Sequence, residues 1–327
     1  MAGDPRRIAR PVHNGAGRVS GAHSRHMTSR ITLPPGLDDG PFTTRAAAEL
    51  GVGEARLRGP DLARPFHGVR SPQSAVALGQ RARALQLRLP EPGFFCSITA
   101  ALIQGMPLSR RHERTRELHV GMPSPMRSSR CVGTVGHKFL IDRRDLCEWY
   151  SLRMTVPVRT WCDLANVLDL EDLVAAGDYV IHFEQGLATY PELAAAAARH
   201  RGRRGRARLF EALGLLSDRS RSRAESIIRT TIVLAGIEGL VVNQPIADAR
   251  GVVFAEGDLC FPAHLVIFEY QGDYHRTEPG RWRKDQTRKA RLAAAGWAVV
   301  EIAGDELEDR RMLLQIIRDT LALHPAR

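Results

Sequence analysis

The residues with the clearest potential for chemistry lie near the end of the chain, around Glu269. Residues 264–271 (HLVIFEYQ) predict a β-strand that stops before Gly272. Side chains alternate between the two faces of a strand, so Glu269 and Gln271 share a face with apolar residues. An ionised Glu in such surroundings is unfavourable unless a cation or hydrogen-bond donors meet it. Since no Lys or Arg stands on the same strand, we expect a metal ion beside Glu269.

Asp258 is the expected partner of Glu269 in holding that ion. Residues 252–261 predict a second strand, which a turn at Pro262 and Ala263 joins to the first. A hairpin of this size can bring the two carboxylates side by side across the ladder. Oxygen ligands of this kind suit Mg²⁺ or Mn²⁺. Asp258 also has a simpler interpretation, as a turn residue after Gly257.

Three further residues are candidates to assist at the same site, and each has an alternative role. Gln271 can orient a water or a phosphate oxygen. Glu225 stands on a predicted helix from Ser222 to Ala235, where it can also form a capping box with Ser222. His275 can move a proton or contact a leaving phosphate, or be an ordinary loop histidine. The candidate catalytic set is therefore Glu225, Asp258, Glu269, Gln271 and His275.

A basic helix is predicted from Arg283 to Ala295. Its charge suits the phosphate backbone of a nucleic acid. The candidate nucleic-acid contacts are Arg281, Arg283, Lys284, Arg288 and Lys289. Asp285 precedes Arg288 by three residues, where a surface ion pair is the simpler expectation.

The elements that position these residues predict one α/β unit over residues 207–325. Its expected order is a helix, three strands, the basic helix, a strand at 297–302 and a last helix capped by Asp305. A unit of this length can fold alone.

The upstream sequence predicts three further segments. Residues 1–30 form a basic tail without periodicity, which we expect to be disordered, and Met27 is an alternative start. Residues 38–90, with predicted helices at 44–50 and 53–62, indicate a small winged-helix-like domain; a docking subdomain without DNA contact is the alternative. Residues 91–200 predict a middle α+β region in which His119 and His137 are expected to be structural.

The composition restricts the class of protein and its partners. The net charge is +11. Residues 1–30 carry six Arg and one Asp, for a net charge of +5, and residues 199–223 carry nine Arg against two acidic residues, for +7. Such segments favour a polyanionic partner such as nucleic acid, although a solvated linker has the same charge pattern. Five scattered cysteines favour a reducing cytoplasm. We expect no membrane span and no nucleotide cofactor.

The last third of the chain resembles the PD-(D/E)xK nuclease superfamily. It is most similar to the Vsr-like family of domains related to the very-short-patch-repair endonucleases. The residues that carry the resemblance are SRAE at 222–225, GDL at 257–259, FEYQG at 268–272, His275, Asp285 with Arg288, and LAAAGW at 292–297. The resemblance implies a restriction-endonuclease-like fold, with Asp258 and Glu269 at the metal positions. The upstream part looks like the region that accompanies such domains in many actinobacterial proteins, in which an antitoxin-like winged helix begins the chain and a segment similar to VRTWCDLA at 158–165 lies in the middle.

One departure from the superfamily pattern affects the predicted activity. Gln271 stands where the motif has Lys, and a neutral amide cannot stabilise developing negative charge as an ammonium does. His275 or an Arg can supply that charge instead. The sequence therefore predicts a Mg²⁺- or Mn²⁺-dependent DNA endonuclease. The alternative is an antitoxin-like DNA-binding regulator whose nuclease domain has lost turnover. RNA stays open as a substrate, and nothing in the sequence indicates the oligomeric state.

Overall fold

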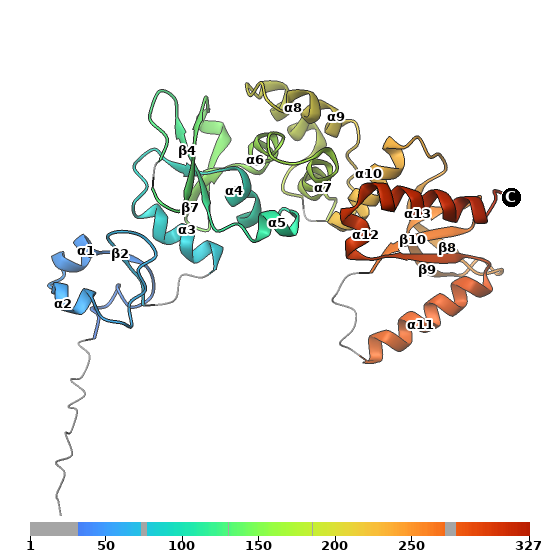
Figure 1. Cartoon of the computed structure of the whole chain (residues 1–327), viewed down its shortest axis with the longest axis horizontal. Helices are drawn as coiled ribbons and strands as arrows, with labels where there is room; N and C mark the ends of the chain where they lie inside the picture. Colours follow the sequence, from blue (N-terminus) through green and yellow to red (C-terminus); the bar gives the residue numbers. More distant parts are fainter. Residues whose placement is uncertain (1–31, 73–76, 130, 185, 272–278) are drawn as a thin grey trace, which may run out of the picture.

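The chain folds into mixed α/β structure with sheets flanked by helices. A computed structural model describes residues 32–72, 77–129, 131–184, 186–271 and 279–327, and for residues 279–283 it describes the backbone only. Within these ranges there are three sheets, of two, five and four strands. They follow one another along the chain, from the N-terminal part at one end of the molecule to the last sheet at the other (Figure 1).

The N-terminal part is small and has short elements. β1 (Phe42–Thr43) pairs antiparallel with β2 (Val69–Arg70), and α1 (Thr44–Glu49) and α2 (Glu54–Leu57) lie between them in sequence. Thr43 caps α1 by accepting a hydrogen bond from the Ala46 N–H. The second predicted helix extended to Leu62, but α2 ends at Leu57, shortly before Gly59 and Pro60. Glycine and proline at these positions stop the helix.

The middle region is built on the five-stranded sheet. Its strand order is β5-β4-β3-β7-β6, with β4 parallel to β5 and β3 parallel to β7. The bounds are β3 Phe94–Phe95, β4 Leu118–Pro123, β5 Thr134–Phe139, β6 Leu146–Trp149 and β7 Leu152–Thr155, with helices α3 Leu78–Gln86, α4 Ser97–Ile103 and α5 Arg110–Glu113. Leu85 of α3 belongs to the core of this sheet, although the sequence analysis placed it in the winged-helix-like segment.

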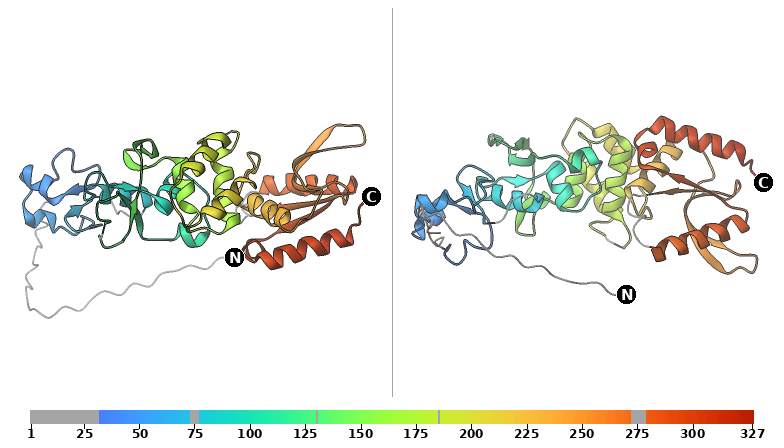
Figure 2. Two further views of the ribbon diagram at one scale, coloured as in Figure 1. Left: turned by 90° about the horizontal axis from the view of Figure 1, so that it is seen from above. Right: turned by 60° about the horizontal axis from the view of Figure 1, so that its bottom comes forward.

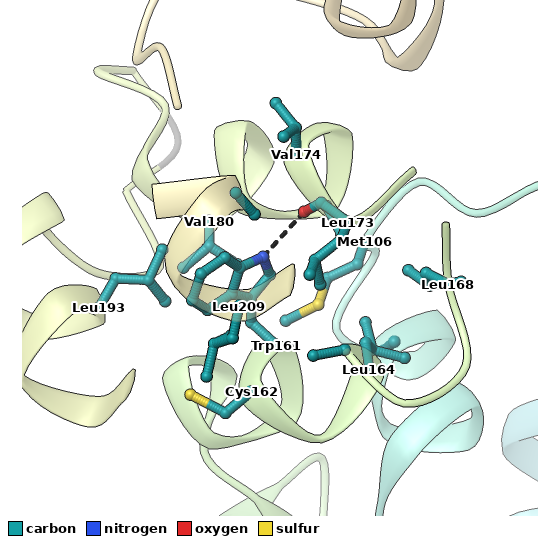
Figure 3. Packing of buried hydrophobic residues seen from close by; sticks show 14 of the residues in the cluster. Met106, Trp161, Cys162, Leu164, Leu168, Leu173, Val174, Val180, Leu193 and Leu209 are labelled. Atoms are coloured by element: carbon teal, nitrogen blue, oxygen red, sulfur yellow. Dashed lines mark hydrogen bonds between the residues drawn. The ribbon is translucent and has the colours of Figure 1, made fainter. Parts of the chain in front are cut away.

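Four helices form a second core after the middle sheet. They are α6 Pro157–Leu164, α7 Leu170–Ile181, α8 Tyr190–Arg199 and α9 Arg206–Leu213. Trp161 is fully buried at the centre, where its indole N–H donates to the Leu173 carbonyl at 2.9 Å (Figure 3). Leu209 of α9 packs into this core, so α9 is separate from the last unit to which its sequence position assigned it.

The last unit contains the predicted order of elements around the four-stranded sheet. The bounds are α10 Arg223–Leu234, β8 Val241–Ala247, β9 Val253–Phe261, β10 Val266–Tyr270, α11 Pro279–Ala294, β11 Ala298–Ile302, α12 Gly304–Glu308 and α13 Arg310–Leu323. The strand order is β11-β10-β9-β8, with β10 parallel to β11 and the other pairs antiparallel. Asp305 lies inside α12, and Asp309 caps α13 instead, because the chain breaks into two helices there.

Helices cover both faces of this last sheet. α10 and α13 pack on one face, against Val266 and Phe268 of β10. α11 packs on the opposite face, where Leu292 meets Ile267 (Figures 1 and 2). Alternating apolar residues in β10 therefore contact two separate helix layers, as expected for a strand buried on both faces.

A buried polar cluster joins the helical core to the last unit. Asp178 of α7 accepts hydrogen bonds from the Arg229 guanidinium at 2.8 Å and from the Ser226 hydroxyl at 2.7 Å, both on α10. Its second oxygen accepts from the Ser217 N–H at 2.7 Å. Asp178 is 1% exposed. The two parts therefore share a desolvated and well-satisfied contact.

No helix in the described ranges combines the length and the apolar composition that a bilayer span requires.

Candidate functional site

Glu269 is paired with a protein cation from another element, whereas the absence of Lys and Arg from its own strand led us to expect a metal ion there. It is 9% exposed on β10. Arg288 reaches it from α11, with Nη1 2.7 Å from Oε1 and Nη2 2.5 Å from Oε2. This two-point contact raises the pKa of Arg288. Since both carboxylate oxygens bind Arg288, a metal ion is not needed to neutralise Glu269.

Asp258 lies close to Glu269, as the hairpin predicts. Leu259 of β9 pairs with Phe268 of β10, and the same register continued by one residue places Asp258 opposite Glu269. Asp258 is half-buried, and burial raises its pKa to about 7, with further increases from the charges of Glu225 and Glu269. Its carboxyl group has no hydrogen-bond or ion-pair partner among the described residues. Asp258 is therefore the acidic group at this site without a direct partner among the described residues, although the nearby charge of Arg288 offsets part of the increase in its pKa.

Glu225 approaches the same point from the first turn of α10, and it also has the capping role. Its Oε1 accepts from the Ser222 hydroxyl at 3.0 Å, and its Oε2 accepts from the Arg221 N–H at 2.9 Å. The Ser222 hydroxyl in turn accepts from the Glu225 N–H at 3.1 Å. Burial raises the pKa of Glu225. The two interpretations are compatible, because the Glu225 carboxylate binds Ser222, the N-cap of α10, and also acts electrostatically on Asp258.

The two remaining catalytic candidates are less well placed. Gln271 follows β10 and is exposed; its backbone N–H donates to the Ile302 carbonyl at 3.0 Å, and its side chain has no partner in the described ranges. His275 lies outside the described residues.

The predicted nucleic-acid contacts on α11 divide into two groups. Arg288 and Lys289 are bound within the unit: Lys289 Nζ lies 2.5 Å from Glu301 Oε1 and 2.9 Å from Asp285 Oδ2, and Arg288 also contacts Asp285 at 3.4 Å. Lys284 is exposed. The side chains of Arg281 and Arg283 lie outside the described part.

The site contains three carboxylates and one guanidinium: the charges of Glu225, Glu269 and Arg288 all act on the pKa of Asp258. Within the described ranges, no group of three or more His, Cys, Asp or Glu side chains has the geometry to hold a metal ion. The oxygens of Asp258 and Glu269 are nonetheless of the chemical type that Mg²⁺ prefers. Glu269 can accept a cation only after Arg288 has left it, whereas Asp258 requires no such exchange.

Sequence reasoning missed the pairing of Arg288 with Glu269. A signal for it exists, because Arg288 stands four residues before Leu292, which is fully buried. Residues four apart share a helix face, so Arg288 had to face the sheet. Sequence reasoning also missed that His119 and His137 contact one another, with Nδ1 and Nε2 3.0 Å apart. Burial, followed by the charge of His137, lowers the pKa of His119 to about 4.

Comparison with known proteins gives relatives over most of the chain. Uncharacterized protein Rv2248 of Mycobacterium tuberculosis strain H37Rv is 26% identical over 268 residues, which are 81% of this chain and 94% of the relative. Uncharacterized protein MT2308 of strain CDC 1551 has the same identity and coverage. No family model and no solved structure matches the chain. The chain is thus similar to these mycobacterial proteins over nearly their whole length, across both the middle region and the last unit.

Proposed function

We propose that the last unit is a metal-dependent DNA endonuclease of the Vsr-like PD-(D/E)xK type, which hydrolyses phosphodiester bonds. The observation that carries the proposal is the half-buried carboxyl of Asp258, placed next to Glu269 without a hydrogen-bond partner among the described residues. Burial beside two like charges raises the pKa of Asp258 to about 7. Strongly perturbed acids of this kind concentrate at functional sites.

The topology of the last unit supports the same proposal. A helix, three consecutive antiparallel strands, a crossover helix and a parallel strand agree with the restriction-endonuclease-like fold that the resemblance implies. The acidic residues lie on neighbouring strands and at the N-terminus of α10, close enough that Glu225 and Glu269 both raise the pKa of Asp258.

Asp258 and Glu269 would hold the Mg²⁺ or Mn²⁺ ion. When bound, it would lower the pKa of a water molecule and neutralise charge on the scissile phosphate. Arg288 has to leave Glu269 for that carboxylate to accept a cation. The released guanidinium can then donate two parallel hydrogen bonds to phosphate oxygens. Arg288 thereby supplies the positive charge that Gln271 lacks.

The other residues would act by orientation and proton transfer. Glu225 already has a raised pKa and can accept a proton beside Asp258. Gln271 is exposed and can orient water or a phosphate oxygen. Lys284, with Arg281 and Arg283 on the same helix, would contact the nucleic-acid backbone without reading its sequence.

A cleavage assay tests the proposal. Purified protein is incubated with plasmid, linear, mismatched and single-stranded DNA, and with RNA in parallel, in Mg²⁺ or Mn²⁺. We expect cleavage of at least one DNA form by the wild type and none by Glu269→Ala or Asp258→Asn. Circular dichroism checks that the variants are folded. Absence of cleavage by a folded wild-type protein in either metal would overturn the proposal.

A second candidate function is a DNA-binding regulator whose nuclease domain has lost turnover. It is favoured by the Arg288–Glu269 pair, because Arg288 occupies the carboxylate of Glu269 that would otherwise bind metal. It is also favoured by Gln271, which stands in place of the motif Lys. A cavity of about 600 Å³ beside α1 is lined by Arg64, Phe66, His67 and Arg70 among others, a combination that suits nucleic acid. Gel shifts on the protein's own promoter separate the two functions, because the regulator binds without metal and cuts nothing.

A further inference from the structure

The connection between α8 and α9 presents a strongly basic surface on the helical core. Residues 199–208, called the arginine loop below, contain six arginines and no acidic residue. Five of these arginines are exposed, namely Arg199, Arg201, Arg203, Arg204 and Arg206. None of the six has an acidic ion-pair partner among the described residues. The loop therefore presents net positive charge to the solvent.

The backbone of the arginine loop is fixed to the helical core, which distinguishes it from a solvated linker. Gly205 has a φ of +71°, and a Cβ at this position would overlap the Ala165 carbonyl at the end of α6. Arg208 Nη1 donates to the same carbonyl at 3.1 Å, and Arg206 Nη1 donates to the His200 carbonyl at 2.7 Å. Two arginines thus hold the loop in place. The side chains of the other four form no hydrogen bond with the described residues.

Two carboxylates lie near one end of the arginine loop, and neither pairs with it. Asp142 and Asp145 line a small cavity together with Arg199 and Arg201. Asp145 is bound by Arg159 of α6, whose Nη1 lies 3.0 Å from its Oδ2. Asp142 is exposed, so that water and salt screen its charge. These acids therefore leave the outer arginines free of a counterion from this side.

The excess of positive charge acts on His200 inside the arginine loop. His200 is buried, and its pKa is lowered to about 4 by burial and then by the charges of Arg159 and Arg206. Asp145 acts in the opposite direction and more weakly. The surroundings of the loop thus disfavour a further positive charge, as expected where an anionic partner would be welcome.

Among polyanions, duplex DNA fits the arginine loop best. A duplex carries one negative charge per about 1.7 Å of its axis, and arginine can bind phosphate through two parallel hydrogen bonds. A single strand would instead need exposed aromatic rings on which its bases stack. Phe210 follows the loop and is 43% exposed, but the guanidinium of Arg206 lies over its ring, 5.0 Å from the centroid. A membrane surface would need a wider apolar face than this one covered ring.

We propose that the arginine loop binds the sugar–phosphate backbone of duplex DNA, with Arg201, Arg203 and Arg204 as its phosphate contacts. The choice of DNA over RNA rests on the proposed function, whereas binding requires neither metal nor cleavage. Figure 1 shows α8 and α9 at the upper edge of the molecule and α11 at the lower edge, so the loop is a contact surface separate from α11. Phosphate contacts carry no sequence information, so this surface should bind duplexes of any sequence.

Fluorescence anisotropy with the full chain tests the proposal. The probe is a short labelled DNA duplex of random sequence, titrated in EDTA at salt concentrations between about 50 and 200 mM. The variant combines Arg201→Gln, Arg203→Gln and Arg204→Gln. We expect it to bind at least roughly tenfold more weakly at the middle of this range, and to reduce the slope of log K against log salt by roughly 2–3, because three phosphate contacts are lost.

Two further triple variants separate the charge of the arginine loop from other effects. Lysine at the same three positions keeps the charge and should retain the salt slope. The combination of Arg250→Gln, Arg311→Gln and Arg318→Gln removes three exposed arginines elsewhere in the last unit, and it should leave the affinity within about twofold. Circular dichroism checks that all the variants are folded.

Unchanged affinity and salt slope in the arginine-loop variant would overturn the proposal, and so would the absence of duplex binding by the folded wild type. Tighter binding of a duplex RNA of the same sequence would overturn the choice of DNA. Vesicles containing phosphatidylserine are a further probe: vesicle binding that the variant loses, with DNA binding unchanged, would show that the loop binds a membrane surface instead. Failure of the nuclease proposal is seen separately, as a wild type that binds the duplex and does not cut it in Mg²⁺ or Mn²⁺.

Discussion

Two buried Arg–carboxylate pairs in this protein have different surroundings. Asp178 receives Arg229, Ser226 and the Ser217 N–H, so both of its oxygens are satisfied between α7 and α10. Among the described residues, Glu269 receives Arg288 alone, and it lies beside Asp258, which has the same sign of charge. The first pair has the character of a structural contact. The second has one partner in the described part of the chain, and the proposed metal site requires that this partner can leave.

The largest expected effect is at the structural pair. Arg229→Ala leaves Asp178 buried with its cation removed, and we expect a loss of about 3–5 kcal/mol in the free energy of unfolding. Urea denaturation at pH 7 measures it. The control is Arg250→Ala, where the exposed pair with Asp248 should contribute less than about 1 kcal/mol. A similarly small loss for both variants would show that the Asp178–Arg229 pair is not the structural contact described above.

A smaller loss is expected at the exchangeable pair, and it should respond to metal. Arg288→Ala removes the cation from Glu269 and Asp258, and we expect it to lower the free energy of unfolding by about 1.5–3 kcal/mol. Because the Arg288 side chain is partly exposed, we expect a value at the lower end of this range. Millimolar Mg²⁺ should restore part of this loss but none of the loss in Arg229→Ala. Arg291→Ala, which removes a cation from the same helix, is the control. If Mg²⁺ stabilises Arg288→Ala no more than the wild type, Asp258 and Glu269 do not form a metal site.

The raised pKa of Asp258 predicts that stability depends on pH. Its pKa is raised from 3.8 to about 7 by burial, so the folded state binds the proton more tightly than the unfolded chain. Stability should therefore fall as pH rises from about 4 to 7. Asp258→Asn removes this slope and should be more stable than wild type by about 1–2 kcal/mol at pH 8, after allowance for solvent screening. Thermal unfolding across this range measures both. An unchanged slope in the variant would place the titration elsewhere.

His119 of the middle sheet predicts the opposite slope and the smallest effect. Its pKa is lowered from 6.5 to about 4 by burial, then by His137, so the unfolded chain binds the proton more tightly. Stability from this group should be lost as pH falls from about 6.5 to 4, by about 1 kcal/mol for a half-buried ring. His119→Gln should flatten that loss in the same unfolding measurements. A variant that keeps the full acid loss would contradict the assignment.

The sequence predicted the last unit better than the rest because its elements are long and strongly periodic. β9 and β10 alternate apolar residues on both faces, and their short connection fixes the register that places Asp258 near Glu269. In contrast, β3 has two residues and β6 and β7 four each, too few for a periodic signal. The predicted winged-helix-like segment also has short elements, and α2 has four residues where the sequence predicted ten.

The partner of Glu269 could not be read from local pattern for a different reason. Arg288 is nineteen residues away, and the contact exists only because α11 crosses the face of the sheet. The assignment of α9 to the helical core also depends on tertiary packing. The apolar periodicity around Leu209 predicts a helix but does not tell whether that helix packs on the helical core or on the last unit. The sequence therefore identified the charged candidate residues, but the pairs that they form depend on how the helices pack on the sheet.

The polar cluster around Asp178 also has a consequence for any attempt to divide this protein. A fragment that begins at α10 would carry the guanidinium of Arg229 and the hydroxyl of Ser226 to a newly created surface, without the carboxylate that they bind. The complementary fragment would keep Asp178 with the Ser217 N–H on one oxygen and with both donors of its other oxygen removed. We therefore expect neither fragment to fold stably alone, so that the helical core and the last sheet have to be expressed or transferred as one unit.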